Sequence, residues 1–164
     1  MHGTIFLLSE AETAPDKAII DKCTAEASRY FGDIFDYIDD MVVRDPAEEC
    51  GRFLDEIKEY AKVDGKRIAF SIRDLYRHDF KVLGYPERKG KLFVDYFMFL
   101  YWLRENRNYL DPVILFDTHG SLALGYSLLD AALQPYYDDI LLGRFPDAEK
   151  AYSYYLSGVL DYHI

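Results

Sequence analysis

The sequence lacks the long apolar run that a membrane-spanning helix needs. Its longest apolar stretch, Leu92 to Leu103, has 12 residues and is interrupted by Asp95, whereas a bilayer span takes about 20. The first residues, MHGTIFLLSEAE, have no basic flank and do not resemble a secretory signal. We therefore expect no transmembrane segment and no secretion signal.

Cysteine is also scarce, because the chain has only Cys23 and Cys50, which form neither a CxxC pair nor a disulfide framework. This scarcity makes a reducing, cytoplasmic compartment the expected location. The sequence contains no internal repeat, no low-complexity tract and no linker that would divide it. We expect one globular domain over residues 1–164, and nothing in the sequence predicts a cofactor.

Basic residues are outnumbered, with 19 Lys and Arg against 29 Asp and Glu and a formal net charge of −10. A general nucleic-acid binder is therefore not expected, because Lys and Arg supply the affinity for a phosphate backbone. Residues 1–63 carry 15 acidic and 7 basic side chains, residues 64–110 carry 6 and 10, and residues 111–164 carry 8 and 2. Such a surface favours a basic protein partner, although solubility alone is the simpler explanation of an acidic composition.

Three short apolar runs predict buried strands, at residues 4–8, 67–72 and 112–116. The longer stretches between and after them predict helices, and one of them starts at Asp45-Pro46, which suits an N-cap and the first helical position. The last predicted helix is capped by Asp147 and carries Tyr152, Tyr155, Leu156 and Val159. The expected fold is an α/β domain with a small, largely parallel three-stranded sheet flanked by about six helices. A helix-rich α+β domain is the alternative.

The leading functional interpretation depends on residues 33–43. As a strand, neither face of this segment is uniformly apolar. As a helix, its apolar side chains gather on one side, so we expect an amphipathic helix with an acidic outer face. That face would present Asp33, Asp36, Asp39 and Asp40, with Tyr37 beside them. A second acidic and aromatic group follows further along the chain, at Tyr136, Tyr137, Asp138 and Asp139.

These two groups predict a small acidic interaction module that docks on a basic protein, with inhibition of a nucleic-acid-binding protein as one version. The 15 tyrosines fit this interpretation because tyrosine is enriched at interfaces. A solvated acidic surface without a partner is the simpler explanation. The apolar stretch 92–103 predicts a helix that is covered by its own domain or by a second copy in a homodimer.

The alternative function is a small enzyme or an anion-binding protein with its site at Asp117–Ser121. This segment follows a predicted strand and precedes a predicted helix at residues 122–133, where ligands gather in open α/β sheets. His119 would act as a base, Asp117 would orient it, and Thr118 and Ser121 would contact the substrate. The same residue types also make ordinary turns and helix caps, so whether the protein is an enzyme stays open.

Two other groups are weaker candidates. A metal site assembled from His78, Asp79, Asp117 and His119 has no supporting spacing, so no metal is predicted. The segment 67–91 could bind a phosphate or a nucleotide, or it could pair with the acidic remainder of the protein. Its basic side chains and histidine are Arg67, Arg73, Arg77, His78, Lys81, Arg88, Lys89 and Lys91.

Overall fold

The computed structural model describes residues 2–12, 14, 16–31, 37–39, 46–83, 113–116, 122–125, 127–136, 138–139, 142, 144 and 147–163. In chain order the helices and strands within these ranges are β1 (His2–Ser9), α1 (Lys17–Phe31), β2 (Tyr37–Asp39), α2 (Pro46–Ile57), β3 (Lys62–Asp64), β4 (Arg67–Ser71), α3 (Ile72–Leu83), β5 (Val113–Phe116), β6 (Leu122–Gly125), α5 (Leu128–Leu133), a short 3-10 helix (Gln134–Tyr136) and β7 (Ala151–His163). None of these described helices is long and apolar enough to cross a membrane.

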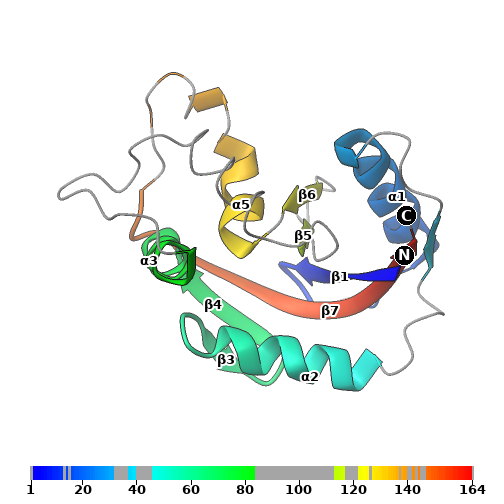
Figure 1. Cartoon of the computed structure of the whole chain (residues 1–164), viewed down its shortest axis with the longest axis horizontal. Coiled ribbons are helices and arrows are strands. Elements are labelled where there is room, and N and C mark those ends of the chain that lie inside the picture. Colours follow the sequence, from blue (N-terminus) through cyan, green and yellow to red (C-terminus); the bar gives the residue numbers. More distant parts are fainter. Residues whose placement is uncertain are drawn as a thin grey trace.

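A mainly antiparallel sheet organises the described residues around its longest strand, β7. The strands β3, β4, β7 and β1 lie in that order, and each neighbouring pair among them is antiparallel. Beyond β1, the sheet continues with β5, which is parallel to β1, and then with β6, which is antiparallel to β5. The short strand β2 pairs with the end of β7. His2 lies opposite His163, so the two chain ends are neighbours (Figure 1).

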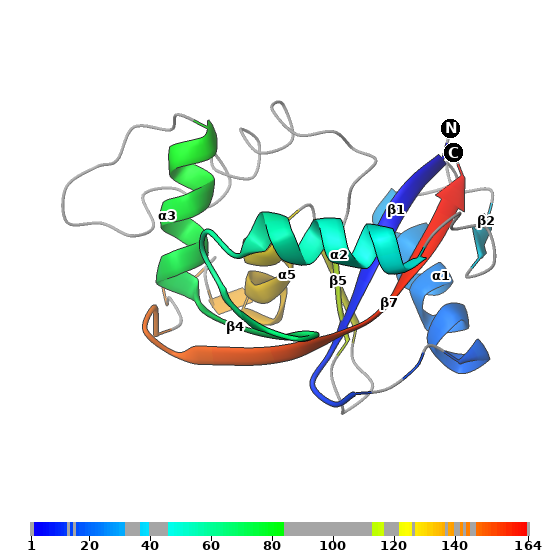
Figure 2. The same ribbon diagram turned by 90° about the horizontal axis from the view of Figure 1, so that it is seen from below.

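The helices cover the sheet on both faces. Figures 1 and 2 show α2 lying across one face, while α1 and α5 lie on the other and α3 stands at the end of β4. On the first face, the Phe6 ring of β1 stacks on Phe53 of α2, with centroids 4.2 Å apart. α1 contributes Ile19 and Cys23 to the core. Burial raises the pKa of Cys23 to about 12, so this thiol stays protonated and unreactive at neutral pH.

Local signals in the sequence account for several of these elements. The three predicted strands at 4–8, 67–72 and 112–116 are confirmed as β1, β4 and β5, and α2 begins at Pro46 as expected. The carboxylate of Asp16 accepts a hydrogen bond from the Ile19 backbone N–H at 2.9 Å and so caps α1. Gly65, with φ of +58°, is in the left-handed region and allows the tight turn between β3 and β4.

The predicted sheet architecture is wrong. We expected a largely parallel three-stranded sheet with about six helices, but β1–β5 is the one parallel pair among the described strands, and the described helices are α1, α2, α3 and α5. The helix-rich α+β alternative is also wrong, because strands occur throughout the described residues, from β1 to β7, and pair in one sheet. Strands β2, β3, β6 and β7 were not predicted as strands, and they supply most of the antiparallel pairing.

The error at β7 has a specific physical cause. The spacing of Leu156 and Val159 predicts a helix, yet both residues are buried on one face of a strand. The register pairs Leu8 with Leu156 but Leu7 with Gly158, so Ser157 has no opposite residue on β1. This bulge adds one residue to the strand and turns a spacing of two into a spacing of three. Asp147 accepts a hydrogen bond from the Glu149 N–H at 3.0 Å in a turn and caps no helix.

The predicted helix at 122–133 is correct only in its second half. Residues 122–125 form β6, and the helix α5 starts at Leu128. Ser127 caps α5, because its hydroxyl oxygen accepts a hydrogen bond from the Asp130 N–H at 3.1 Å. Gly125 lies so close to Ala131 that a Cβ atom built on it would be 2.3 Å from the Ala131 nitrogen. The strand therefore needs a glycine where it meets the helix.

Candidate functional site

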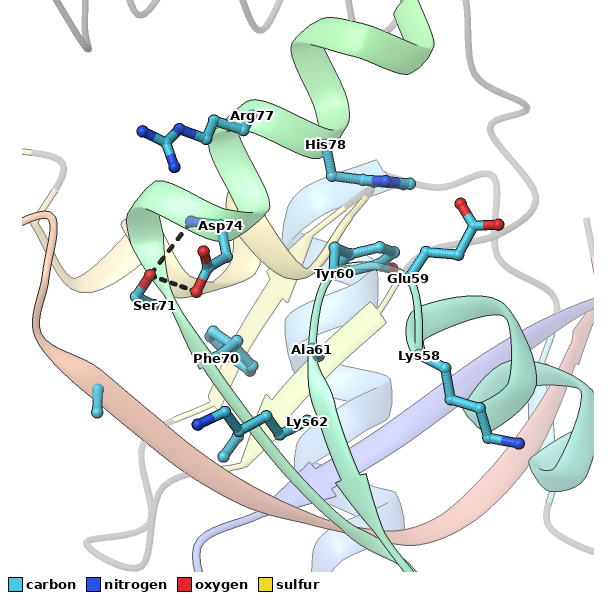
Figure 3. A pocket seen from close by; sticks show the side chains of 12 residues that line it. Lys58, Glu59, Tyr60, Ala61, Lys62, Phe70, Ser71, Asp74, Arg77 and His78 are labelled. Atoms are coloured by element: carbon cyan, nitrogen blue, oxygen red, sulfur yellow. Dashed lines mark hydrogen bonds between the residues drawn. The ribbon is translucent and has the colours of Figure 1, made fainter.

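A pocket of about 600 Å³ lies between α3 and the β3–β4 hairpin, and we call it the α3 pocket (Figure 3). The turn after α2, strands β3 and β4, helix α3 and the start of β7 all contribute to it. Its lining residues are Lys58, Glu59, Tyr60, Ala61, Lys62, Ala69, Phe70, Ser71, Asp74, Arg77, His78 and Ala151. Figure 3 shows α3 above this pocket and the hairpin strands below it.

Local hydrogen bonds fix both sides of the α3 pocket. On one side, the carbonyl oxygen of Ile57 accepts hydrogen bonds from the N–H groups of Tyr60 and Ala61, at 3.1 and 2.9 Å, which ends α2 and turns the chain into β3. On the other side, Ser71 and Asp74 cap α3 reciprocally. The Ser71 hydroxyl accepts from the Asp74 N–H at 3.2 Å and donates to the Asp74 carboxylate at 2.7 Å. The framework is therefore set by short-range contacts.

Aromatic rings form one wall and the floor of the pocket. The rings of Tyr60 and His78 are stacked, with centroids 3.8 Å apart and an interplanar angle of 25°. Phe70 is buried in the floor, and its ring stacks on Tyr152 and on Tyr154, each at 5.9 Å. Because these contacts hold the rings in place, the pocket offers a prearranged apolar surface.

Two cations border the pocket without a counter-ion. Within the part of the chain that the structure describes, the side chains of Lys62 and Arg77 make no hydrogen bond or ion pair. By contrast, Lys58 is paired with Asp55. In Figure 3 the charged groups of Lys62 and Arg77 lie on one side of the Tyr60 ring and the carboxylate of Glu59 lies on the other. The pocket therefore has both unpaired cations on one side of Tyr60, together with the Asp74 carboxylate that is bonded to Ser71, and Glu59 on the other side.

The chemistry of the lining residues suits binding better than nucleophilic catalysis. No cysteine lines the pocket, and its serine, Ser71, uses both its donor and its acceptor in the cap of α3. A serine nucleophile requires a base that takes its proton, and the partner here is Asp74, itself part of that cap. What the pocket offers a ligand is positive charge, a carboxylate and aromatic surface.

The predicted acidic helix at 33–43 is wrong where it can be examined. Tyr37 and Asp39 lie in β2, an extended segment that pairs with β7, and the register sets Asp39 opposite Asp161 and Tyr37 opposite His163. An extended strand cannot gather every third or fourth residue on one side, so the proposed outer face does not form there. The remaining members of that face, Asp33, Asp36 and Asp40, lie outside the described residues.

The second predicted acidic group is only partly exposed for recognition. Asp138 and Asp139 are exposed, and Asp139 pairs with Arg144 at 3.4 Å. Tyr136 is half-buried and bonded within the fold, since its hydroxyl accepts a hydrogen bond from the Tyr152 hydroxyl at 3.1 Å. Burial, and next this bond, raise the pKa of Tyr152. The fourth member of the group, Tyr137, lies outside the described residues.

The alternative site at Asp117–Ser121, with Thr118 and His119, also lies outside the described residues. Its flanking residues, Phe116 and Leu122, are an antiparallel pair, so the segment connects two strands and does not lead into the helix that we expected. Ser9 of β1 lies beside Phe116 in parallel register. The apolar stretch 92–103, which was considered as a homodimer face, falls outside the described part of the chain as well.

Metal ligands are not grouped in the described part of the chain, where no three His, Cys, Asp or Glu residues could hold one ion. His78, a member of the weak metal candidate, instead stacks on Tyr60. The side chain of Asp79 is outside the described set.

The basic segment 67–91 divides into paired and unpaired members. Arg73 forms an ion pair with Glu149, and the Arg67 Nε donates to the Ser153 hydroxyl at 2.9 Å. The Arg77 side chain has no partner among the described residues and borders the α3 pocket. The side chains of the other basic members, Lys81, Arg88, Lys89 and Lys91, lie outside the described set. The basic segment recognised in the sequence thus contributes Arg77 and His78 to the pocket. The sequence interpretation missed Tyr60 and Lys62, because the hairpin that brings them opposite α3 was interpreted as the end of a helix.

Comparison of the chain with protein-family models, with curated proteins and with solved structures found no match. The case for a function therefore depends on the geometry of the chain itself.

Proposed function

We propose that this protein binds a small anionic ligand in the α3 pocket. Anion binding was also the alternative function considered from the sequence, but there its site was Asp117–Ser121, whereas here the site is the α3 pocket. The observation that carries it is the pair of cations, Lys62 and Arg77, which border an aromatic pocket and have no counter-ion in the described part of the chain. Concave, partly apolar sites with a few convergent polar groups are where proteins bind small molecules.

Lys62 and Arg77 have no carboxylate partner among the described residues of an acidic protein; the exposed Lys66 has none either, but it does not line the pocket. Acidic residues exceed basic ones by ten, so each Lys or Arg has carboxylates available to it. Other described cations do pair, as in Arg29–Glu26, Arg52–Glu49 and Lys58–Asp55. Individual surface pairs contribute little to stability, and leaving two cations unpaired at one pocket keeps them available to an anion from solution. The volume of about 600 Å³ is also within the range of about 300–1,000 Å³ that small ligands occupy.

Replacing both cations by neutral residues tests this function. Titration calorimetry of the wild type with phosphate esters, carboxylates and sulfonates should identify an anion that binds. The double variant Lys62→Gln, Arg77→Gln should bind that anion about 100-fold more weakly, because two charge-assisted hydrogen bonds of about 1.5–3 kcal/mol are at stake. Lys66→Gln is the matched control, since Lys66 is an exposed cation of the same hairpin that does not line the pocket. Equal affinity of the double variant and the wild type would disprove the proposal.

A second candidate function, docking on a basic protein, is favoured by the surface around Leu142. This leucine is 68% exposed, and four exposed residues near it in the chain are acidic, namely Asp138, Asp139, Asp147 and Glu149. The exposed Arg144 and Lys150 lie in the same stretch, and Asp139 and Glu149 are paired with Arg144 and Arg73, which leaves Asp138 and Asp147 as the acidic residues without an ion pair in the described part of the chain. An apolar side chain among carboxylates suits a partner that has basic residues around an apolar pocket. This candidate retains the interaction module predicted from the sequence and its second acidic group, at Asp138 and Asp139, but without the helix at residues 33–43.

Neutralising the acidic residues around Leu142 tests this second candidate. The variant Asp138→Asn, Asp139→Asn should retain less basic protein at low salt, and lysozyme and histones serve as basic probes. The expected loss is roughly fivefold and should vanish at high salt, because exposed charges act mainly through screened steering. Glu12→Gln, an exposed acid near α1, is the control. Identical retention of the variant and the control would contradict this function.

A further inference from the structure

The α3 pocket has a directional arrangement that restricts the shape of its ligand. Unpaired cations lie on one side of the Tyr60 ring, and the Glu59 carboxylate lies on the opposite side (Figure 3). The stacked rings of Tyr60 and His78 lie between these two sides. A ligand that uses all three features has an anionic end, a flat middle and an end that donates hydrogen bonds.

We propose that the ligand is a phosphorylated planar ring compound of mononucleotide size. This inference rests on the proposed function, since it names the chemical class of the anion that the same pocket would take. Its phosphate lies toward Lys62 and Arg77, its ring contacts the aromatic wall, and its amino or hydroxyl groups donate to Glu59.

Charge balance favours a phosphate monoester over a carboxylate. A phosphate monoester carries about 1.5 to 2 negative charges at neutral pH and has three acceptor oxygens. The Asp74 carboxylate, which accepts a hydrogen bond from Ser71, lies on the same side of the pocket as Lys62 and Arg77. A phosphate brings two charges and a third oxygen with which to bind both cations beside this carboxylate, whereas a carboxylate ligand brings one charge and two oxygens. Arg77 also offers a planar guanidinium with several donors, a geometry that matches phosphate oxygens. Lys58 does not change this balance, because Asp55 already compensates its charge.

The aromatic surface favours a planar ring over an aliphatic chain. Tyr60 and His78 stack on each other at 3.8 Å and both line the pocket, so a ligand ring would contact the outer faces and edges of this pair. Phe70 and Ala69 add an apolar floor. Stacking on an aromatic side chain contributes to the binding of every kind of nucleobase, because each base has a π face. Glu59 has no partner in the described part of the chain and accepts hydrogen bonds only, so it selects a ring or sugar that carries N–H or O–H donors.

Three related probes separate the parts of this inference: adenosine 5′-monophosphate, adenosine, which lacks the phosphate, and ribose 5-phosphate, which lacks the base. We expect calorimetry at neutral pH and low salt to rank the mononucleotide first. Adenosine should bind about 100-fold more weakly, because it loses the charge-assisted contacts. Ribose 5-phosphate should bind about 10-fold more weakly, because it loses the stacked ring.

Each result decides a different claim. If ribose 5-phosphate binds as tightly as the mononucleotide, the ring has no role, and the further inference fails while the proposed function stands. If adenosine binds as tightly as the mononucleotide, the phosphate has no role and the inference fails. If none of the three binds but a carboxylate or sulfonate does, the proposed function stands and the phosphate class is wrong. If no anion binds, both are wrong.

Variants locate the binding in the α3 pocket. Tyr60→Leu should bring the affinities for the mononucleotide and ribose 5-phosphate close together. Glu59→Gln should weaken the mononucleotide more than ribose 5-phosphate, because only the mononucleotide adds the amino group of its ring to the sugar hydroxyls as donors to Glu59. Circular dichroism would show whether Tyr60→Leu folds. If it does not, the ratio of the mononucleotide affinity to the ribose 5-phosphate affinity, compared between the wild type and Glu59→Gln, still tests the assignment. Unchanged ratios in both variants would overturn the assignment to this pocket.

Discussion

Gly125→Ala is expected to destabilise the protein by about 3 kcal/mol or to prevent folding, because overpacking against rigid atoms costs this much. The added Cβ would lie 2.3 Å from the backbone nitrogen of Ala131, and 2.8 and 2.9 Å from its Cα and Cβ. A clash with a flexible side chain is relieved by rotation, but these atoms belong to the helix itself. α5 would therefore have to move away from β6 as a body, and the core contacts of both elements would loosen. The free energy of unfolding, measured in urea, reports the effect.

Gly51→Ala is the matched control for this substitution. Gly51 lies in the interior of α2, and a Cβ built on it would meet nothing within 4 Å. Alanine in an open helical position stabilises by about 0.5–1 kcal/mol relative to glycine. The same change should thus have opposite signs at the two positions. A Gly125→Ala variant as stable as the wild type would show that β6 and α5 are not in close contact.

Leu129→Ala is expected to have a similarly large effect, a loss of about 3 kcal/mol. Leu129 is 0% exposed, and every residue of α5 is buried. A six-residue helix has no stability of its own, so α5 depends on its packing. Removing three buried carbons costs about 2–5 kcal/mol, through lost burial and through the cavity that remains.

Leu142→Ala makes the same chemical change at an exposed site. Leu142 is 68% exposed, so its truncation should change the free energy of unfolding by less than about 0.5 kcal/mol. The difference between the two variants measures the contribution of burial alone. If Leu129→Ala and Leu142→Ala were equally mild, α5 would not belong to the core, and the position of β6 beneath it would also be in question.

Elements with a strong local signal could be predicted from the sequence. The run Thr4–Leu8 is apolar enough to be a buried strand in any arrangement, and Pro46 after an acidic residue starts α2. α3 lies in one of the stretches between predicted strands where we expect a helix, and its apolar side chains recur at helical spacing. In each case the residues carry the signal within a few positions. No knowledge of a distant partner is needed.

Elements whose identity depends on a distant partner could not be predicted. β2 has three residues, and only its pairing with β7 distinguishes it from a helix or a loop. β7 has the opposite problem, since it is long but the bulge at Ser157 breaks its alternation. The short hairpin strand β3 was absorbed into the end of the preceding helix. Strand pairing depends on tertiary context more than helix propensity does, which explains why the errors concentrate in the sheet.

The same reasoning applies to the candidate site. Arg77 and His78 stood out in the sequence as part of a basic segment, and both line the α3 pocket. Lys62 and Tyr60 are about fifteen positions away along the chain, and nothing in their immediate neighbourhood marks them. They reach the pocket because Gly65 reverses the chain between β3 and β4. The pocket could therefore be predicted only together with the β3–β4 turn that brings these residues opposite α3.

The place of β7 in the sheet has a consequence for how the polypeptide is made. A ribosome releases residues 151–163 after all the other described elements, yet this strand holds β1, β2 and β4 together. Until it emerges, those earlier strands expose unsatisfied edges that can pair with other nascent chains. Native pairing between residues so far apart in sequence is also intrinsically slow. Chaperone assistance during synthesis would matter most in that interval. A truncated chain that ends before Ala151 would keep those strand edges unpaired and would be prone to aggregate.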